Sequence, residues 1–367
     1  LIVSRIRRPA TVPRRGAARW LLDFVDPFLP TTGQRLAFHA ERQGSDLVVG
    51  GRGQRGSQAI ETRVQLTPAD VGPFAITTDG AYAFVLLRND AAYLEAMLAA
   101  FSLRAVPVNM NHRYTGEELA HLLTDSGAVA LLVHETLTGA VASVPGGVDG
   151  LRSLLIVPDP DPSTVEGEVA DLAGAVDYEA ALAAASPEPV VTAGRSGDDE
   201  YLMYTGGTTG RPKGVVWRQE DAFFACIGGG DPMRLSGPVE APPELLDRII
   251  DFEFVAFPLA PMMHAAAQWT SLSWLFCGAR VVMNPGSFDA LATWQAVQDH
   301  KVSTLIVVGD AMVRPLIDAW DEHGPFDTSS LYAVGSGGAP LTAALKDRLI
   351  EILPNAMVTD GFGSSET

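Results

Sequence analysis

The sequence contains little cysteine, little lysine and no long apolar run. Only two cysteines, Cys226 and Cys277, occur among 367 residues, and they lack the C-x-x-C spacing of zinc and redox motifs. This usage favours a reduced, cytoplasmic setting over a disulfide-linked one. No uninterrupted apolar stretch approaches the roughly 20 residues that a transmembrane helix needs, so we expect no membrane-spanning segment.

Positive charge is scarce as well. The formal net charge is -18 at pH 7, which would repel a phosphate backbone, and we therefore expect no nucleic-acid partner. Arginines cluster only near the start, and the stretch after them is interrupted by Asp23 and Asp26, so we predict no export signal. The length favours more than one packed subdomain, and the sequence leaves the oligomeric state open.

The chain changes character near residue 79. Residues 1–78 show neither strand alternation nor a helical stripe, and we leave them unassigned, as an atypical start or a reading-frame error. Strand and helix patterns alternate in residues 79–160 and again in residues 199–367, with a linker-like stretch at 161–198 rich in Pro, Asp and Ala. Because such alternation produces parallel sheets covered by helices, we predict an α/β fold with two doubly wound, mostly parallel sheet subdomains.

The stretch "YTGGTTGRPKG", residues 204–214, concentrates glycine and threonine around one lysine. Its glycines can turn successive backbone N–H groups into one concavity, its threonines add hydroxyl donors, and Lys213 adds a compact charge suited to phosphate. The stretch fails the GxxxxGK[ST] pattern, and "VVWR" after it predicts a strand, so we expect a loop between two strands. A plain hairpin loop is the alternative to a triphosphate site. The residues that we assign to ATP are Thr205, Gly206, Gly207, Thr208, Thr209 and Gly210, with Lys213 as a catalytic residue.

This stretch resembles the phosphate loop of the adenylate-forming enzymes, which include acyl-CoA synthetases, luciferases and peptide-synthetase adenylation domains. "GSGGAPL" at 335–341 resembles the family's adenine-site loop, and "DGFGSSET" at 360–367 resembles its motif with an adenine-stacking aromatic, a hydroxyl at the α-phosphate and a magnesium-binding glutamate. The resemblance gives these last three roles to Phe362, Ser365 and Glu366, with Glu366 also catalytic. It assigns further ATP contacts to Gly337, Gly338, Ala339, Asp360, Gly361 and Gly363.

His264, in "PLAPMMHAAAQW", lies where the family places a histidine beside the acyl carboxylate, and the resemblance implies a catalytic role. The alternative is a histidine packed at a helix start with its nitrogens satisfied. The spacing of Trp269, Trp274 and Phe276 favours the core over a pocket, whereas Met262 and Met263 are compatible with an adaptable tunnel.

The resemblance implies an acyl-CoA synthetase that uses ATP, Mg²⁺ and coenzyme A on a small-molecule carboxylic acid. Residues 254–269 contain no acidic side chain to pair with an amino group, and "VVWRQED" and "GDAMVRPLIDA" look similar to actinobacterial fatty-acid and sterol side-chain CoA ligases. The alternatives are an aryl-acid or carrier-protein acyl ligase and a catalytically silent nucleotide-binding protein. The resemblance covers the N-terminal domain of the family, and with the C-terminal domain missing we expect weak ATP binding and poor adenylation.

Overall fold

The structure of the chain is a computed structural model. It describes backbone and side chains for residues 81–148, 150–159, 169–185, 194–206, 212–233, 235–240, 244–250 and 252–365, with residue 246 and four strands within residues 2–65 described as backbone alone. Within these ranges, no helix combines the length and the apolar character that crossing a bilayer requires.

The first sheet has seven strands in the order β11-β10-β6-β5-β7-β8-β9. All neighbours are parallel except β10 and β11, which form an antiparallel hairpin. Its strands are β5 (Tyr82–Leu86), β6 (Val106–Asn109), β7 (Ala130–His134), β8 (Ser153–Val157), β9 (Val176–Asp177), β10 (Glu200–Thr205) and β11 (Lys213–Arg218).

The second sheet has nine strands in the order β1-β4-β2-β3-β13-β12-β14-β15-β16. The five strands β12 to β16 pair in parallel. Strand β3 pairs antiparallel with β13, so residues from the unassigned N-terminal part extend this sheet. Its strands are β1 (Ile2–Arg5), β2 (Ala37–Gln43), β3 (Asp46–Arg52), β4 (Thr62–Gln65), β12 (Val255–Pro258), β13 (Arg280–Met283), β14 (Thr304–Val307), β15 (Ala333–Ser336) and β16 (Met357–Asp360).

Helices connect the parallel strands, and polar side chains start several of them. Asp90 accepts a hydrogen bond from the backbone of α2, and Thr115 forms a capping box with Glu118 at the start of α3. The described helices of at least three residues are α2 (Ala91–Ser102), α3 (Gly116–Ser126), α4 (Thr138–Ala142), α5 (Tyr178–Ala184), α6 (Gln219–Asp221), α7 (Glu244–Asp247), α8 (Ala265–Phe276), α9 (Ala290–Asp299), α10 (Gly309–His323) and α11 (Ala343–Ile352), with short turns of other helix types at Glu135–Leu137, Ala222–Cys226 and Gly228–Gly230.

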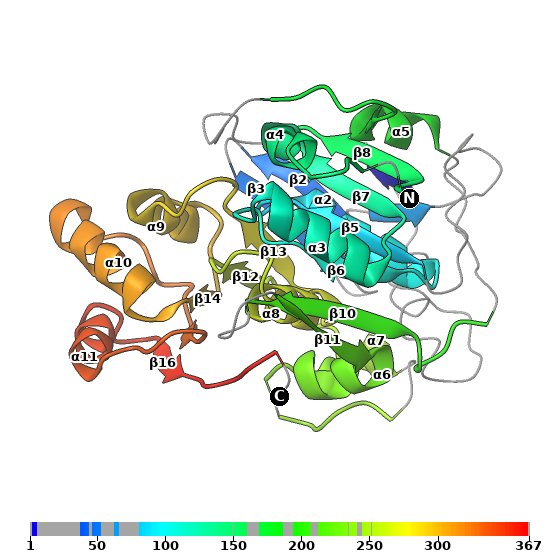
Figure 1. The fold of residues 1–367 in the computed structure, drawn as a ribbon. Helices are drawn as coiled ribbons and strands as arrows, with labels where there is room; N and C mark the ends of the chain where they lie inside the picture. Colours follow the sequence, from blue (N-terminus) through cyan, green and yellow to red (C-terminus); the bar gives the residue numbers. More distant parts are fainter. Residues whose placement is uncertain are drawn as a thin grey trace.

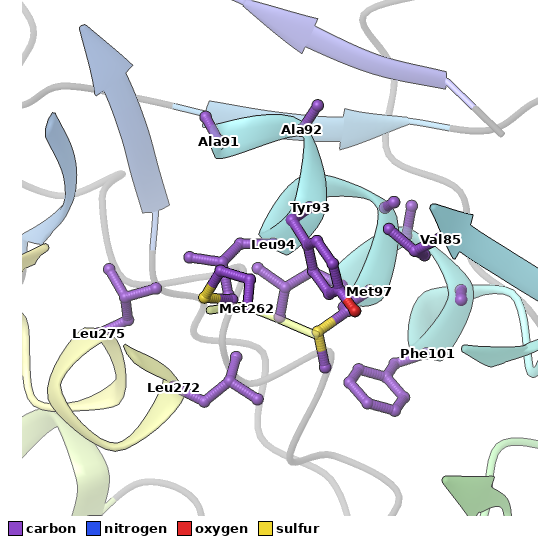
Figure 2. Packing of buried hydrophobic residues seen from close by; sticks show 14 of the residues in the cluster. Val85, Ala91, Ala92, Tyr93, Leu94, Met97, Phe101, Met262, Leu272 and Leu275 are labelled. Atoms are coloured by element: carbon purple, nitrogen blue, oxygen red, sulfur yellow. The ribbon is translucent and has the colours of Figure 1, made fainter. Parts of the chain in front are cut away.

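The two sheets and their helices form stacked layers. Alternate residues of β5 point to opposite faces, so that Ala83 and Val85 join one apolar cluster and Phe84 and Leu86 another. The first of these clusters contains α2 and α8 together with inward residues of both sheets, which places these two helices between the sheets. Figure 2 shows this middle layer, where side chains of α2 face those of α8.

Helices α9, α10 and α11 cover the outer face of the second sheet, with Trp294 fully buried in their shared core (Figure 1). Helices α3 and α4 cover the outer face of the first sheet. The predicted α/β class with two largely parallel sheets is therefore confirmed, and the antiparallel strands of the second sheet are an addition that the sequence did not indicate. Helix α9 begins at Ala290, because the Asp289 side chain provides its cap.

The sheets do not divide the chain at the boundary predicted near residue 199. Strand β10 pairs with β6, and the hairpin β10–β11 therefore belongs to the first sheet although its motif was grouped with the second block. Residues 161–168 and 186–193 of the linker-like stretch lie outside the described residues, so the proposed subdomain boundaries stay a prediction.

Candidate active site

A pocket of about 540 Å³ opens where strands of both sheets end. Its lining comes from residues 203–206 at the end of β10, from residues 335–338 after and within β15, and from residues 361–365 directly after β16. The start of α8, the segment before it, and Ile306 and Val308 in and directly after β14 also line the pocket. In α/β folds the carboxyl ends of parallel strands are the usual place for a ligand.

Most of the described residues that the sequence predicted for the site meet in this pocket. The predicted site residues that line it are Thr205, Gly206, His264, Gly337, Gly338, Gly361, Phe362, Gly363 and Ser365. Lys213, Ala339 and Asp360 are described but are not among its lining residues. Gly207, Thr208, Thr209, Gly210 and Glu366 lie outside the described residues.

The hairpin confirms that the glycine and threonine stretch joins two strands. Thr205, the last residue of β10, pairs with Lys213, the first residue of β11. The Lys213 side chain is exposed, one strand away from the pocket wall. Trp217, further along β11, donates a hydrogen bond from Nε1 to the carbonyl oxygen of Ser365 at 2.8 Å. The strand that follows the glycine and threonine stretch is therefore in direct contact with the motif at 360–367.

The turns that follow β15 and β16 lie next to each other. Gly338 has a φ of +79°, a conformation that favours glycine. A Cβ atom on Gly337 would lie 3.6 Å from the carbonyl oxygen of Gly361, so the backbones at 337 and 361 lie side by side. The N–H of Gly361 donates to the carbonyl of Ser336 at 2.9 Å, which continues the β15–β16 pairing up to the pocket. Next to this contact the Phe362 side chain is fully exposed.

His264 occupies the N-cap position of α8 but makes no side-chain cap bond. Its ring is accessible from the pocket, which it lines. The protein atoms crowded around the ring desolvate it, and this burial, together with the positive charge of Arg113, lowers the pKa of His264 below its ordinary value. This lowering favours the neutral ring, which keeps one N–H donor.

Three amide side chains fix the chain segment just before His264, and the sequence reasoning had assigned none of them. Asn89 accepts from the N–H of Met262 at 2.7 Å and donates to the carbonyl of Ala260 at 3.3 Å. Asn109 donates to the carbonyl of Met263 at 2.7 Å.

The third amide, Gln268, is buried within α8. It donates to the carbonyl of Met262 at 2.7 Å and to the Tyr93 hydroxyl at 3.2 Å, and it accepts from the hydroxyl of Tyr201. Burial raises the pKa of Tyr201 far above its ordinary value, so this hydroxyl stays a donor. The position of Asn89 and Asn109 beside the ends of β5 and β6 is the one signal in the sequence that could have singled them out.

The remaining wall of the pocket is apolar. Met263, Ala265, Ile306 and Val308 line it, and among the described lining residues none is acidic. Trp269, whose spacing favours the core over a pocket, does both: it packs against the core of the middle layer and also lines the pocket. Its ring, on α8, packs edge-on against the ring of Trp217 in the β10–β11 hairpin, with ring centroids 6.1 Å apart.

The other side chains considered with Trp269 are core residues. Trp274 stacks on Phe254 with ring centroids 4.3 Å apart, and Phe276 is fully buried, as their spacing predicted. Met262 is buried in the middle layer, and only Met263 of the two methionines reaches the pocket. Across the part of the chain that the structure describes, no group of three or more His, Cys, Asp or Glu side chains could hold a metal ion.

Comparisons with known proteins identify the family of the chain. Residues 78–367 match the family of AMP-binding enzymes. The chain is 38% identical over 288 residues to the 3-oxocholest-4-en-26-oate–CoA ligase of Rhodococcus rhodochrous, covering 76% of the chain and 50% of that protein. It is 42% identical over 291 residues to the medium-chain acyl-CoA ligase Mig of Mycobacterium avium, covering 78% of the chain and 50% of the relative.

A solved structure shows the same fold. The N-terminal domain of FACL13 from Mycobacterium tuberculosis superposes with a TM-score of 0.61 at 24% identity, over 81% of this chain and 66% of that one. The structure defines an α/β protein with a pocket at the carboxyl ends of strands from both sheets. The match over most of its length shows that the chain belongs to the AMP-binding enzyme family. It spans about half the length of the curated relatives that it matches.

Proposed function

We propose that the protein is an AMP-forming acyl-CoA synthetase, which activates a carboxylic acid with ATP and passes the acyl group to coenzyme A. One observation carries this proposal: residues from three separate predicted motifs, together with His264, line one pocket. Membership of the AMP-binding family and the names of the relatives add support.

The proposed reaction has two steps. A carboxylate oxygen of the acid attacks the α-phosphorus of ATP, the bond from this phosphorus to the bridging oxygen breaks, and pyrophosphate leaves. The product is a mixed anhydride of the acid and AMP. The sulfur of coenzyme A then attacks the carbonyl carbon, the bond to the AMP oxygen breaks, and the thiol proton passes to water. The first step brings two anions together, so donors that face the phosphates lower its barrier.

The residues of the pocket suit these tasks. In our proposal the backbone N–H groups and hydroxyls from Thr205 onward hold the phosphates, with Lys213 adding charge from the neighbouring strand. The exposed ring of Phe362 stacks on adenine, and the hydroxyl of Ser365 meets the α-phosphate. Neutral His264 donates its N–H to the acid. Mg²⁺, for which Glu366 is the predicted ligand, supplies further charge on the phosphate oxygens.

The pocket also favours a class of acid. An apolar wall of Met263, Ala265, Trp269 and Ile306 accommodates an apolar body, and the described lining residues offer no carboxylate to pair with an amino group. We therefore propose a fatty or sterol-type acid without an α-amine. Two of the relatives are named as ligases of a medium-chain acyl group and of a sterol-derived acid, which supports this class. For the reasons given from cysteine usage, we propose that the protein works in the cytoplasm.

Acid-dependent exchange of labelled pyrophosphate into ATP tests the proposal. The panel contains medium- and long-chain fatty acids, a sterol side-chain acid, aryl acids and amino acids, and thioester formation is followed with coenzyme A or a carrier protein as acceptor. We expect exchange with fatty or sterol-type acids, and a loss of about 100-fold or more in Lys213→Ala.

Lys346→Ala is the matched control, because this lysine lies on α11 and does not line the pocket. Exchange with aryl acids alone, or transfer only to the carrier protein, identifies the alternative ligases. ATP binding in calorimetry without exchange for any acid contradicts the proposal and favours a silent nucleotide-binding protein.

A further inference from the structure

Asn109 joins two walls of the pocket through its side-chain amide. It is the last residue of β6, and only 6% of its surface is exposed. Its Oδ1 accepts from the N–H of Tyr204 at 2.7 Å, while its Nδ2 donates to the carbonyl of Tyr204 at 2.9 Å and to that of Met263 at 2.7 Å. All three partners are main-chain atoms of segments that line the pocket.

The Asn109 side chain forms hydrogen bonds to the main chain of β10 just beyond the last paired residues of β6 and β10. Strand β10 pairs with β6 through the register of Leu202 with Val108. Beyond this point the Asn109 amide supplies to Tyr204 the donor and the acceptor that a neighbouring peptide group would have supplied. The Tyr204 hydroxyl donates to Asp125 of α3 at 2.6 Å, so the backbone and the side chain of this residue are both anchored.

The two bonded residues directly precede groups assigned to the reaction. Tyr204 precedes Thr205 at the start of the glycine and threonine loop, and Met263 precedes His264. We propose that Asn109 is a positioning residue, which sets the distance between the loop proposed to hold phosphate and the histidine proposed to face the acid. Its effect on catalysis rests on the proposed function, whereas its effect on the two segments does not.

Only a primary amide of this length fits the site. Asparagine offers one acceptor and two donors, and all three are used. Asn109→Asp keeps the acceptor for Tyr204 but places a second oxygen against two carbonyl oxygens. Asn109→Ala removes all three bonds. Neither change alters a residue that faces the pocket, because Asn109 itself does not line it.

Two control variants separate positioning from general loss of stability. Ser303→Ala removes a buried side-chain bond to the main chain, since the Ser303 hydroxyl accepts from the N–H of Val255 at 3.1 Å, at the ends of the strands away from the pocket. Asn111→Asp makes the same chemical change two residues along the chain, where the side-chain oxygen that accepts from the N–H of Arg113 is retained.

Hydrogen exchange measured by mass spectrometry on the whole chain tests directly whether Asn109 holds the two segments. In Asn109→Asp and Asn109→Ala we expect backbone amides of residues 203–206 and 262–265 to exchange at least about fivefold faster than in the wild type. In Ser303→Ala and Asn111→Asp these segments should exchange at the wild-type rate. Unchanged exchange in either segment of the Asn109 variants overturns the proposal.

Kinetics add the second readout. At a temperature at which the Asn109 variants and Ser303→Ala are fully folded, we expect kcat for pyrophosphate exchange to fall about tenfold or more in Asn109→Asp, with KM for the acid changed less than about threefold. A wild-type kcat in Asn109→Asp, or an equal loss in Ser303→Ala, overturns the proposal. A wild-type chain inactive with every acid refutes the proposed function instead, and hydrogen exchange then decides the role of Asn109.

Discussion

Two of the segments that line the pocket are held by the fold in different ways. Residues 260–264 are fixed by the buried or half-buried amides of Asn89, Asn109 and Gln268, which bond their main-chain atoms. In residues 361–365 the N–H of Gly361 donates to the carbonyl of Ser336 in the second sheet, and the carbonyl of Ser365 accepts from Trp217, while Phe362 between them is fully exposed. The first segment is built into the junction of the two sheets, and the second presents its side chains outward.

This difference separates the energetic roles of the two segments. Where main-chain atoms are bonded by buried side chains, a substitution leaves polar groups without partners and lowers the free energy of unfolding. Where a side chain is exposed beside a pocket, a substitution costs little in the unliganded protein and acts on binding. We therefore expect effects on stability to decrease from the first segment to the second.

The largest effect on stability is expected for Gln268→Leu. This change keeps the volume but leaves the hydroxyls of Tyr93 and Tyr201 and the carbonyl of Met262 without their partner in the middle layer. The free energy of unfolding should fall by about 3 kcal/mol or more, measured by urea denaturation.

Gln295→Leu is the control for this variant, because Gln295 is exposed on α9. It should change the free energy of unfolding by no more than about 0.5 kcal/mol. A loss in Gln268→Leu as small as that of the control would show that the amides do not anchor the first segment.

Much of the fold could be predicted because the relevant signals are local. The alternation of buried strands with helices in residues 79–160 and 199–367 predicts the α/β class, and helices such as α2 and α11 lie within these two stretches. The strands β2 and β3 were missed, because an antiparallel hairpin that only extends a sheet shows no helix after each strand. The place of β10 and β11 in the first sheet was missed for a related reason, since sheet membership depends on pairing across distant parts of the chain.

Part of the site could be predicted because its signals, too, are local in the sequence. Thr205, Gly338 and Phe362 belong to short motifs whose residue types indicate what they can bind, and all three line the pocket. Asn109, Gln268 and Trp217 act through partners 60 residues or more away along the chain, such as Tyr204, Tyr201 and Ser365. Nothing in the sequence around an isolated asparagine, glutamine or tryptophan indicates such a distant partner. These hydrogen bonds could therefore not be predicted from the sequence.

An intermediate effect is expected for Trp217→Phe, which tests the anchor of the second segment. The change keeps an aromatic ring against Trp269 but removes the Nε1 donor to Ser365. The free energy of unfolding should fall by about 1 kcal/mol, and amides of residues 361–365 should exchange faster while those of residues 260–264 do not. Faster exchange in both segments would contradict the separation between them.

A smaller, pH-dependent effect is expected at His264 in the first segment. Because burial and Arg113 lower the pKa of His264 in the folded state, the unfolded chain binds more protons below the ordinary histidine pKa of about 6.5. The contribution of His264 to stability is therefore full above that pH and is lost as the pH falls through the lowered folded-state pKa. Urea denaturation at pH 7.5 and 5.5 should show a smaller loss in His264→Gln than in the wild type.

A second variant sharpens the pH prediction. Arg113→Gln removes the charge that contributes to the shift, so the pKa of His264, followed by NMR, should rise toward the ordinary value. His323→Gln, an exposed position on α10, is the control for the loss of a histidine as such. An unchanged His264 titration in Arg113→Gln would leave desolvation as the sole cause of the shift.

The smallest effect on stability, and the sharpest contrast with Gln268→Leu, is expected for Phe362→Ala. The Phe362 side chain is fully exposed, so its truncation should change the free energy of unfolding by less than about 0.5 kcal/mol. If the ring stacks on adenine as proposed, the same change should weaken binding of Mg-ATP by about 1–3 kcal/mol in calorimetry, the range found for base stacking on aromatic side chains.

Phe362→Tyr keeps the ring face and should bind as the wild type does. Tyr332→Ala, at another exposed aromatic residue outside the pocket lining, should leave binding unchanged. Equal affinity in Phe362→Ala and the wild type would mean that the exposed ring serves neither folding nor the nucleotide, and the proposed division of roles between the two segments would fail at this residue.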